Sequence, residues 1–291
     1  MKVLISGTTG YLGSSLKTLF QQKNWKIREL RRGGSSNFST GEEIVPFKLG
    51  QEPAAGTFSG FDVFIHCAYD FSLGGWEEIK KINIDGSLKC LEAARLSNVR
   101  RIIFISSLSA FDNCLSLYGQ AKLSVEKEAV KMGAFVLRPG LIYGPQSSGI
   151  FGNLVNLVRR SPFIPLVGGG EVPLYLVRLE DLGQLILKIA EGQIQNPGKP
   201  VAVANPAPIS LKGILRQIAQ SLGKKRIFFP VPYNLVFLAL KLGESAGLGQ
   251  RLRSDSLVGL FNPVKDPDFS WVGRSGVGLR NLNLEEILPH S

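Results

Sequence analysis

Tyr118 and Lys122 have the types and the spacing for proton transfer. On a helix, side chains four positions apart lie on one face, so the Lys122 ammonium can lie beside the Tyr118 phenol and favour its ionised form. A free tyrosine, with a pKa of about 10, is a poor base at neutral pH, and a nearby cation lowers that pKa toward the working range. Ser107 ends an apolar stretch and adds a hydroxyl group. Together the three residues predict proton exchange with a carbonyl or hydroxyl compound.

A second motif, formed by Gly7, Gly10 and Gly13, follows the first apolar stretch of the chain. Glycine lets the backbone turn tightly and approach a phosphate without a Cβ atom in the way. The helix expected after the loop presents free amides and a partial positive charge at its N-terminus. The position of the loop between a strand and an amphipathic helix therefore predicts a dinucleotide site. The expected cofactor contacts are Gly7, Thr9, Gly10, Tyr11, Leu12 and Gly13.

The end of the next apolar stretch distinguishes between two cofactors. A carboxylate at this place would accept hydrogen bonds from the ribose of NAD. Arg31 and Arg32 stand there instead, and guanidinium groups suit the additional 2′-phosphate of NADP. We therefore expect NADP rather than NAD. Glu29 leaves the alternative open, since a shift of two residues in the expected register would turn an acid toward the ribose.

Alternating strand and helix patterns must position these residues, and such alternation is typical of parallel strands joined by crossover helices. Strands are expected at 2–6, 25–30, 43–47, 61–68, 101–106 and 134–138, and helices at 11–22, 76–96 and 118–132. Further helices are expected near 150–160, 180–191, 209–222 and 233–245. The predicted fold class is α/β, a doubly wound parallel sheet (Rossmann fold) over residues 1–145. A smaller C-terminal substrate lobe is expected over 146–291, part of which returns to the sheet.

In their order along the chain, the motifs resemble those of the extended short-chain dehydrogenases, the family of nucleotide-sugar epimerases, dehydratases and related reductases. The similar segments are the glycine loop and residues 64–68, 104–107, 118–122 and 137–145. The resemblance implies that Ser107 binds the reacting group, Tyr118 exchanges its proton and Lys122 holds the nicotinamide ribose. It also implies hydride transfer between a substrate carbon and NADP. The further cofactor contacts implied by it are Cys67, Ala68, Tyr118, Lys122 and Pro139.

The second half of the chain resembles the family members that act on nucleotide sugars, in which a late arginine helps to hold the diphosphate. Arginine suits a diphosphate because its fork makes paired, charge-assisted hydrogen bonds. The resemblance implies a small-molecule substrate, either a sugar nucleotide or a related carbonyl or hydroxyl compound, that is epimerised, dehydrated or reduced. Dehydration is less favoured than epimerisation or reduction, because Ser109 and Ala110 stand where dehydratases carry a carboxylate pair. The expected substrate contacts are Tyr69, Arg178 and Arg253.

The loop between Ser107 and Tyr118 is shorter than in most members of the family, which carry substrate contacts there. A short loop fits an altered substrate, and it also fits a fold that has lost catalysis and is kept for binding. The alternative function is therefore a non-catalytic NADP-binding assembly subunit or RNA-associated protein. Ser109 is a second candidate for the role of the serine.

The net charge of +11 and the pI near 9.7 are high for a small metabolic enzyme. The basic pairs are scattered and lack the aromatic interleaving of a single-strand binding platform, so no nucleic-acid partner is expected. A weaker hypothesis is peripheral attachment to a membrane through the basic surface and the helix near 236–242.

Three distant cysteines and two histidines argue against a zinc site and a disulfide framework, so no metal is expected. The chain has no pattern of a signal peptide and no apolar run long enough to span a membrane, which leads us to expect a cytoplasmic protein. The resemblance also implies a homodimer, because members of the family often pair through the helices equivalent to 76–96 and 118–132.

Overall fold

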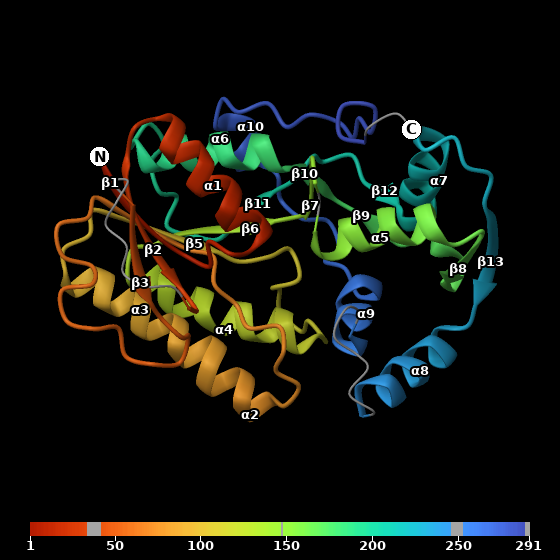
Figure 1. The fold of residues 1–291 in the computed structure, drawn as a ribbon, viewed down its shortest axis with the longest axis horizontal. Helices are drawn as coiled ribbons and strands as arrows, with labels where there is room; N and C mark the ends of the chain where they lie inside the picture. Colours follow the sequence, from red (N-terminus) through yellow and green to blue (C-terminus); the bar gives the residue numbers. More distant parts are fainter. Residues whose placement is uncertain (34–41, 147, 246–252, 289–291) are drawn as a thin grey trace.

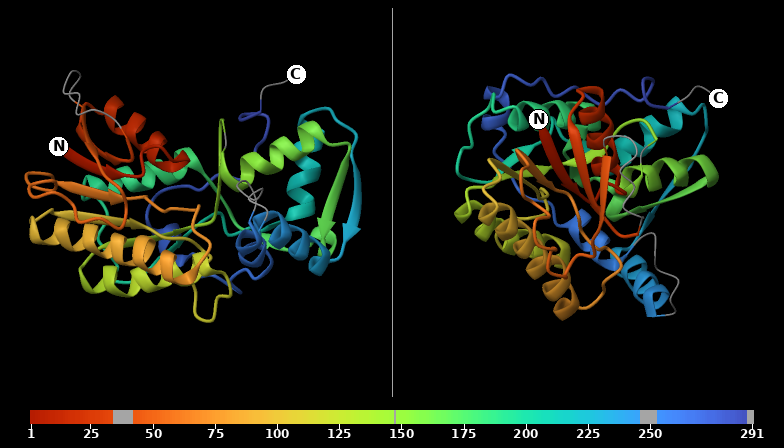
Figure 2. Two further views of the ribbon diagram at one scale, coloured as in Figure 1. Left: turned by 60° about the horizontal axis from the view of Figure 1, so that its bottom comes forward. Right: turned by 60° about the vertical axis from the view of Figure 1, so that its left-hand side comes forward.

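The computed structural model describes residues 1–33, 42–146, 148–245 and 253–288. Its larger part is a parallel sheet with helices on both faces (Figure 1). Its smaller part, formed by segments from the second half of the chain, lies beyond the carboxyl ends of the strands. The left view of Figure 2 shows the two parts beside each other. The predicted α/β class with a Rossmann-type parallel sheet is confirmed.

Within the described residues, the main sheet has the strand order β11-β6-β5-β4-β1-β2-β3, and every pairing is parallel. Val3, Leu4 and Ile5 in β1 are all fully buried, as in a strand that is covered on both faces. The order reverses between β1 and β4, which creates a switch point at their carboxyl ends. The bounds are β1 Lys2–Ser6, β2 Lys26–Arg31, β3 Glu42–Pro46, β4 Val63–His66, β5 Arg101–Ile105, β6 Phe135–Pro139 and β11 Val201–Val203.

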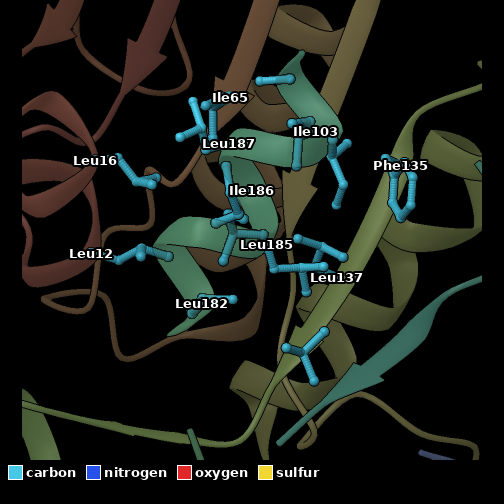
Figure 3. Close-up of a cluster of buried hydrophobic side chains, with 14 of the residues drawn as sticks. Leu12, Leu16, Ile65, Ile103, Phe135, Leu137, Leu182, Leu185, Ile186 and Leu187 are labelled. Carbon is cyan, nitrogen blue, oxygen red and sulfur yellow. The ribbon is translucent and has the colours of Figure 1, made fainter. Parts of the chain in front are cut away.

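One face of the sheet is covered by α1 (Tyr11–Gln22), α6 (Leu179–Ala190) and the short α10 (Ser270–Arg274). The apolar side chains of α1 recur at helical spacing, so that a single stripe is buried. Figure 3 shows how α6 packs against the sheet through its own leucines and isoleucine. The labelled side chains of this cluster are Leu12, Leu16, Ile65, Ile103, Phe135, Leu137, Leu182, Leu185, Ile186 and Leu187.

The other face carries α4 (Leu117–Lys131) and the helical stretch expected at 76–96. This stretch is not a uniform helix, because a π-helical turn interrupts it between two α-helical parts. The parts are α2 Trp76–Ile79, the π-helical turn Lys80–Ile84 and α3 Asp85–Leu96. The π turn buries Asn83, whose amide nitrogen donates to the Asp70 carbonyl at 3.0 Å and whose oxygen accepts from the Asp70 amide at 2.7 Å. The turn therefore fixes the segment that follows β4.

The smaller lobe has a core of its own, in which α5 and α7 pack around Phe151, Ile164 and Ile214. Its short strands pair as β7 with β10 and β8 with β13, both parallel, and as β9 with β12, antiparallel. The bounds are β7 Leu141–Tyr143, α5 Gly149–Arg160, β8 Phe163–Val167, a 3₁₀ turn Gly168–Gly170, β9 Pro173–Leu174, β10 Leu176–Arg178, β12 Ile209–Ser210, α7 Leu211–Ser221 and β13 Ile227–Val231.

Two further helices, α8 (Tyr233–Ser245) and α9 (Ser254–Phe261), complete the lobe. No residue of α8 is fully buried, and its Leu235, Leu238 and Leu242 side chains are exposed. None of the helices in the described ranges is both long and apolar enough to cross a bilayer.

Candidate active site

The carboxyl ends of four neighbouring strands converge between the sheet and the smaller lobe. The glycine loop follows β1, residues 67–70 follow β4, Ser107 follows β5 and Pro139 ends β6. This is the switch point of the sheet, where doubly wound proteins bind their ligands. The fold thus brings the predicted cofactor and proton-transfer residues to one edge.

The glycine loop is packed too closely for side chains at two of its three glycines. Gly7 has a φ of +77°, and a Cβ atom there would lie 2.8 Å from the Ala68 nitrogen and 2.9 Å from the Cys67 carbonyl carbon. A Cβ atom at Gly13 would collide with the Gly7 carbonyl oxygen. Gly10, by contrast, has open space beside it apart from that same oxygen at 3.3 Å, and as the N-cap residue of α1 it has no side chain to bind the first amides of the helix. This bare helix N-terminus fits the phosphates of a dinucleotide.

Ser107 and Tyr118 lie at a cavity between the two parts, and the Nζ of Lys122 lies 6.0 Å from the centroid of the Tyr118 ring. Ser107 and Tyr118 both line the cavity, and the Ser107 hydroxyl is near enough to the phenol to act on the pKa of Tyr118. Lys122 is 4% exposed, lies below them, and its Nζ donates to the carbonyl of Ile105 at 2.8 Å. Tyr69 packs edge-on against the Tyr118 ring, with centroids 4.9 Å apart. The three predicted proton-transfer residues are therefore neighbours in space.

Burial sets the protonation of this group. Desolvation raises the pKa of Tyr118 to about 12, although the Ser107 hydroxyl lowers it, so the expectation that Lys122 brings this pKa down toward neutral pH is wrong. Desolvation also lowers the pKa of Lys122 to about 8, while Cys67 and Glu126 raise it. At neutral pH the phenol is therefore neutral and able to donate a proton, and the lysine is charged.

Two side chains cap the N-terminus of α4, the helix that carries Tyr118 and Lys122. Ser116 accepts a hydrogen bond from the Gly119 amide at 3.1 Å, as an N-cap serine does. Asp255, from α9 of the smaller lobe, accepts from the Leu117 amide at 2.7 Å and from the Tyr118 amide at 3.0 Å. Asp255 was not among the residues predicted from the sequence, because it lies 138 positions from Leu117 and no local pattern relates the two.

The arginines expected at the cofactor differ in their surroundings. The Nε of Arg31 is buried and has no hydrogen-bond partner among the described residues, although it lies 3.9 Å from a Glu29 oxygen. Arg32 is largely exposed and pairs with Asp70 at 3.2 Å. Glu29 is buried and bound by Lys17 at 2.8 Å. Burial by itself raises the pKa of Glu29, but Lys17 and Arg31 hold it below its usual value.

The three expected substrate residues have different positions. Tyr69 and Arg253 line the cavity, where Arg253 donates to the carbonyls of Phe71 at 2.8 Å and Leu73 at 2.6 Å. Arg178 lies outside the residues that line it and forms ion pairs with Glu286 and Glu180. The structure thus brings Tyr69 and Arg253 to the proton-transfer residues and leaves Arg178 apart.

His66 is fully buried in β4 and has a structural environment. Its Nδ1 lies 2.7 Å from the Ser6 hydroxyl and its Nε2 lies 2.9 Å from the Ser87 hydroxyl. Desolvation, together with the charge of Lys122, lowers the pKa of His66 to about 3, so that the ring stays neutral. It connects β1, β4 and α3 rather than facing the cavity.

Comparison with known proteins gives relatives for most of the chain. A ceramide reductase from Caulobacter vibrioides is 35% identical over 171 residues, which are 57% of this chain and 53% of the relative. The match thus spans about half the length of that protein. A UDP-glucose 4-epimerase from Vibrio cholerae is 23% identical over 282 residues, covering 86% of this chain and 84% of the relative.

Among solved structures, the UDP-glucose 4-epimerase of Thermotoga maritima with UDP-glucose has a TM-score of 0.72 at 18% identity. The superposition covers 98% of this chain and 96% of that one, and it supports the same fold for both. The sequence model of the NAD dependent epimerase/dehydratase family matches residues 3–203. This range includes the glycine loop, Ser107, Tyr118 and Lys122. The chain therefore belongs to the NAD dependent epimerase/dehydratase family.

Proposed function

We propose that the protein is an NADP-dependent oxidoreductase that acts on a carbonyl or hydroxyl group through Ser107, Tyr118 and Lys122. The observation that carries the proposal is that Ser107 and Tyr118 line one cavity, with the buried Lys122 ammonium 6.0 Å from the centroid of the Tyr118 ring. A substrate oxygen placed between the two hydroxyl groups could be held by Ser107 while Tyr118 gives or takes the proton. Because the Tyr118 phenol is neutral at neutral pH, donation to a forming alkoxide is the favoured direction.

The residues that would hold the cofactor are those of the glycine loop, the segment after β4 and the end of β6. The N-terminus of α1, which begins after Gly10, would bind the phosphates, and Lys122, which donates to the Ile105 carbonyl, would also donate to a ribose hydroxyl. When bound, the nicotinamide supplies or accepts the hydride. The protein's part is to position the cofactor, exclude water and move the proton.

Arg31 favours NADP over NAD. Its buried Nε has no hydrogen-bond partner among the described residues, so an anionic group at this place would complete its bonding. Glu29, the acid that could have served the ribose of NAD, is instead bound by Lys17. These two observations support the choice of the phosphorylated cofactor.

The names of the relatives suggest two substrate classes, sugar nucleotides from the epimerases and a ceramide from the reductase. Both contain hydroxyl groups whose carbon could give a hydride to an oxidised nicotinamide while the hydroxyl proton passes to Tyr118, so both are compatible with the proposed proton transfer. The reaction type, whether epimerisation or reduction, depends on the substrate that the cavity accepts.

The proposal is tested with cofactor titrations and a Tyr118→Phe variant. NADPH should raise the melting temperature more than NADH does, since a ligand that binds only the folded state stabilises it. Tyr118→Phe should keep this stabilisation and lose roughly 100- to 10,000-fold in kcat, the usual contribution of a proton donor. Turnover that survives in Tyr118→Phe, or a melting temperature that no nicotinamide cofactor raises, would refute the proposal. Cofactor binding without any turnover, together with salt-dependent RNA binding, would favour the non-catalytic alternative.

A further inference from the structure

The cavity above Ser107 and Tyr118 is walled mainly by hydrocarbon. Aliphatic and aromatic side chains from both parts of the molecule line it, among them Leu73, Leu117, Ile142, Phe237, Val258 and Leu260. Its volume of about 710 Å³ is in the range of pockets that enclose most of the surface of a small ligand. A wall of this kind favours ligand groups that leave water readily.

The acidic groups on the wall oppose an anionic substrate. Glu244 of α8 accepts hydrogen bonds from the amide of Ser254 at 2.6 Å and from its hydroxyl at 3.1 Å. Asp255 accepts the two amides at the start of α4. Both carboxylates line the cavity; Glu244 forms an ion pair with Lys241 at 3.8 Å, whereas Asp255 has no ion pair among the described residues. A diphosphate in this space would meet like charges.

The basic groups on the wall are already engaged. Among the described residues that line the cavity, these are Lys241 and Arg253. Arg253 donates to two backbone carbonyls of residues 71–73, and Lys241 lies 3.8 Å from a Glu244 oxygen. Both hydrogen bonds of Arg253 come from Nη1, and Lys241 carries a single ammonium group rather than the guanidinium fork that binds a diphosphate through paired hydrogen bonds. Arg253 and Lys241 therefore contact other parts of the wall, and most of the surface that faces the ligand space is apolar.

The apolar wall continues to the surface of the molecule. Phe71 and Leu115 line the cavity and yet are 63% and 61% exposed, so they lie at its edge. On the far side, Phe237 of α8 lines the cavity while Leu235 and Leu238 of the same helix are exposed. A flexible chain that starts at Tyr118 can therefore stay in contact with apolar side chains over the whole depth of the cavity.

We infer that the substrate carries an alkyl or prenyl chain beside its reacting carbonyl or hydroxyl group. The reacting oxygen lies at Ser107 and Tyr118, and the chain lies against the apolar wall formed by α4, α8 and α9. This inference rests on the proposed function, because it names the substrate class of the same site.

The test is the binding of straight-chain 2-alkanones of increasing length, measured by calorimetry with the full-length protein, with and without NADPH. Each added methylene should tighten binding by up to about fourfold until the chain reaches the mouth, the factor that corresponds to its transfer out of water. UDP-glucose should neither bind tightly nor displace the longer ketones. Affinity that does not change with chain length, or UDP-glucose that displaces the ketones, would overturn the inference.

A matched pair of surface variants separates the cavity from general hydrophobic binding. Leu115→Asp introduces a charge at the mouth and should weaken binding of the long ketones about tenfold while it leaves the shortest ones unchanged. Leu96→Asp, at an equally exposed leucine at the end of α3, should change neither. Equal losses in both variants would also overturn the inference. Cofactor stabilisation and its insensitivity to Tyr118→Phe report on the proposed function separately, so the two can fail independently.

Discussion

Lys122 combines a charge with almost complete burial. Its ammonium has one hydrogen-bond acceptor, the Ile105 carbonyl, and lies over the rings of Phe104 at 4.9 Å and Tyr69 at 5.3 Å. Cation–π contacts and a carbonyl dipole offset part of the desolvation cost. The position holds a cation where Tyr118 can use it, at a cost to folding that the rest of the molecule must offset.

That cost should appear as a dependence of stability on pH. The pKa of Lys122 is about 8 in the folded protein against 10.5 for a free lysine. Between these values the unfolded chain binds the proton and the folded one does not, so the Lys122 contribution to stability rises with pH in this window. Below pH 8 the buried charge is fully present and destabilises the fold by on the order of a few kcal/mol.

Lys122→Met should therefore be more stable than the wild type near neutral pH, and the difference should shrink as the pH rises from about 8 to about 10.5. Urea unfolding at a series of pH values measures this difference in the free energy of unfolding. Lys131→Met, at an exposed lysine later in the same helix, serves as the control and should show no such trend. Parallel stability curves for wild type and Lys122→Met would contradict the assignment of a buried charge.

Arg31 is the residue on which the choice of cofactor depends. Arg31→Ala should weaken NADPH binding roughly 10- to 100-fold, the value of one or two charge-assisted hydrogen bonds, and leave NADH binding nearly unchanged. Fluorescence titration of the two reduced cofactors gives both constants. Arg100→Ala also removes one positive charge, but just before β5, at the opposite ends of the strands. It should change the binding constant of neither cofactor. A similar loss for both cofactors in Arg31→Ala would argue against a 2′-phosphate contact.

At the level of helices and strands, the first half of the chain was predictable from its residues. Strands buried on both faces leave continuous apolar runs, and helices with one buried stripe leave a period near 3.6 residues, so β1 to β6, α1 and α4 were expected close to their observed bounds. The glycine loop and the Tyr118–Lys122 spacing could also be recognised in the sequence, because each is a local pattern.

Elements made by distant contacts were not predictable. β11 is three residues long, and the paired strands of the lobe have two to five, too few for a period to emerge. The cavity wall depends on α9, whose place over α4 is fixed by Arg253 and Asp255. Arg253 was expected from the sequence as a substrate contact and Asp255 had no predicted role, and no local pattern predicts the contacts that the two residues make with distant segments.

The start of α4 depends on that distant contact. Asp255→Ala should remove two hydrogen bonds to the amides of Leu117 and Tyr118 and destabilise the protein by about 0.5–2 kcal/mol, the usual value of an N-cap. It should also lower kcat, because the first turn of α4 carries Tyr118. Asp255→Asn keeps one acceptor, so its stability and its kcat should lie between those of the wild type and those of Asp255→Ala. Thermal unfolding and steady-state kinetics measure the effects, and an Asp255→Ala protein with wild-type kcat would show that the cap does not position the phenol.

At the scale of the whole molecule, the sheet and the lobe are interleaved along the chain. The chain leaves the sheet after β6, forms part of the lobe, returns as α6 and β11, and then completes the lobe. Leu182, Leu185 and Ile186 of α6 are fully buried against the sheet. The face of the sheet that α1 covers thus remains partly uncovered at least until residue 190 has been added.

A fragment of residues 1–145 should consequently fail to form a stable domain, although it contains the glycine loop, Tyr118 and Lys122. It would expose the apolar face that α6 and β11 cover, an area that a folded domain of this size cannot leave in water. Strong binding of a hydrophobic dye and poorly dispersed amide resonances are expected, with the full chain as reference. A well-dispersed spectrum and NADPH binding by the fragment would refute this prediction.

The Asp255 cap also has a consequence for how the protein is made. The amide that it caps and the carboxylate lie 138 positions apart, so a ribosome needs on the order of ten seconds to synthesise the stretch between them. The strand β11 emerges well before Asp255 does. A nascent chain that has passed Val203 can therefore close its sheet while the helix that carries Tyr118 still lacks its second cap, and the proton-transfer site is among the last parts of the molecule to be completed.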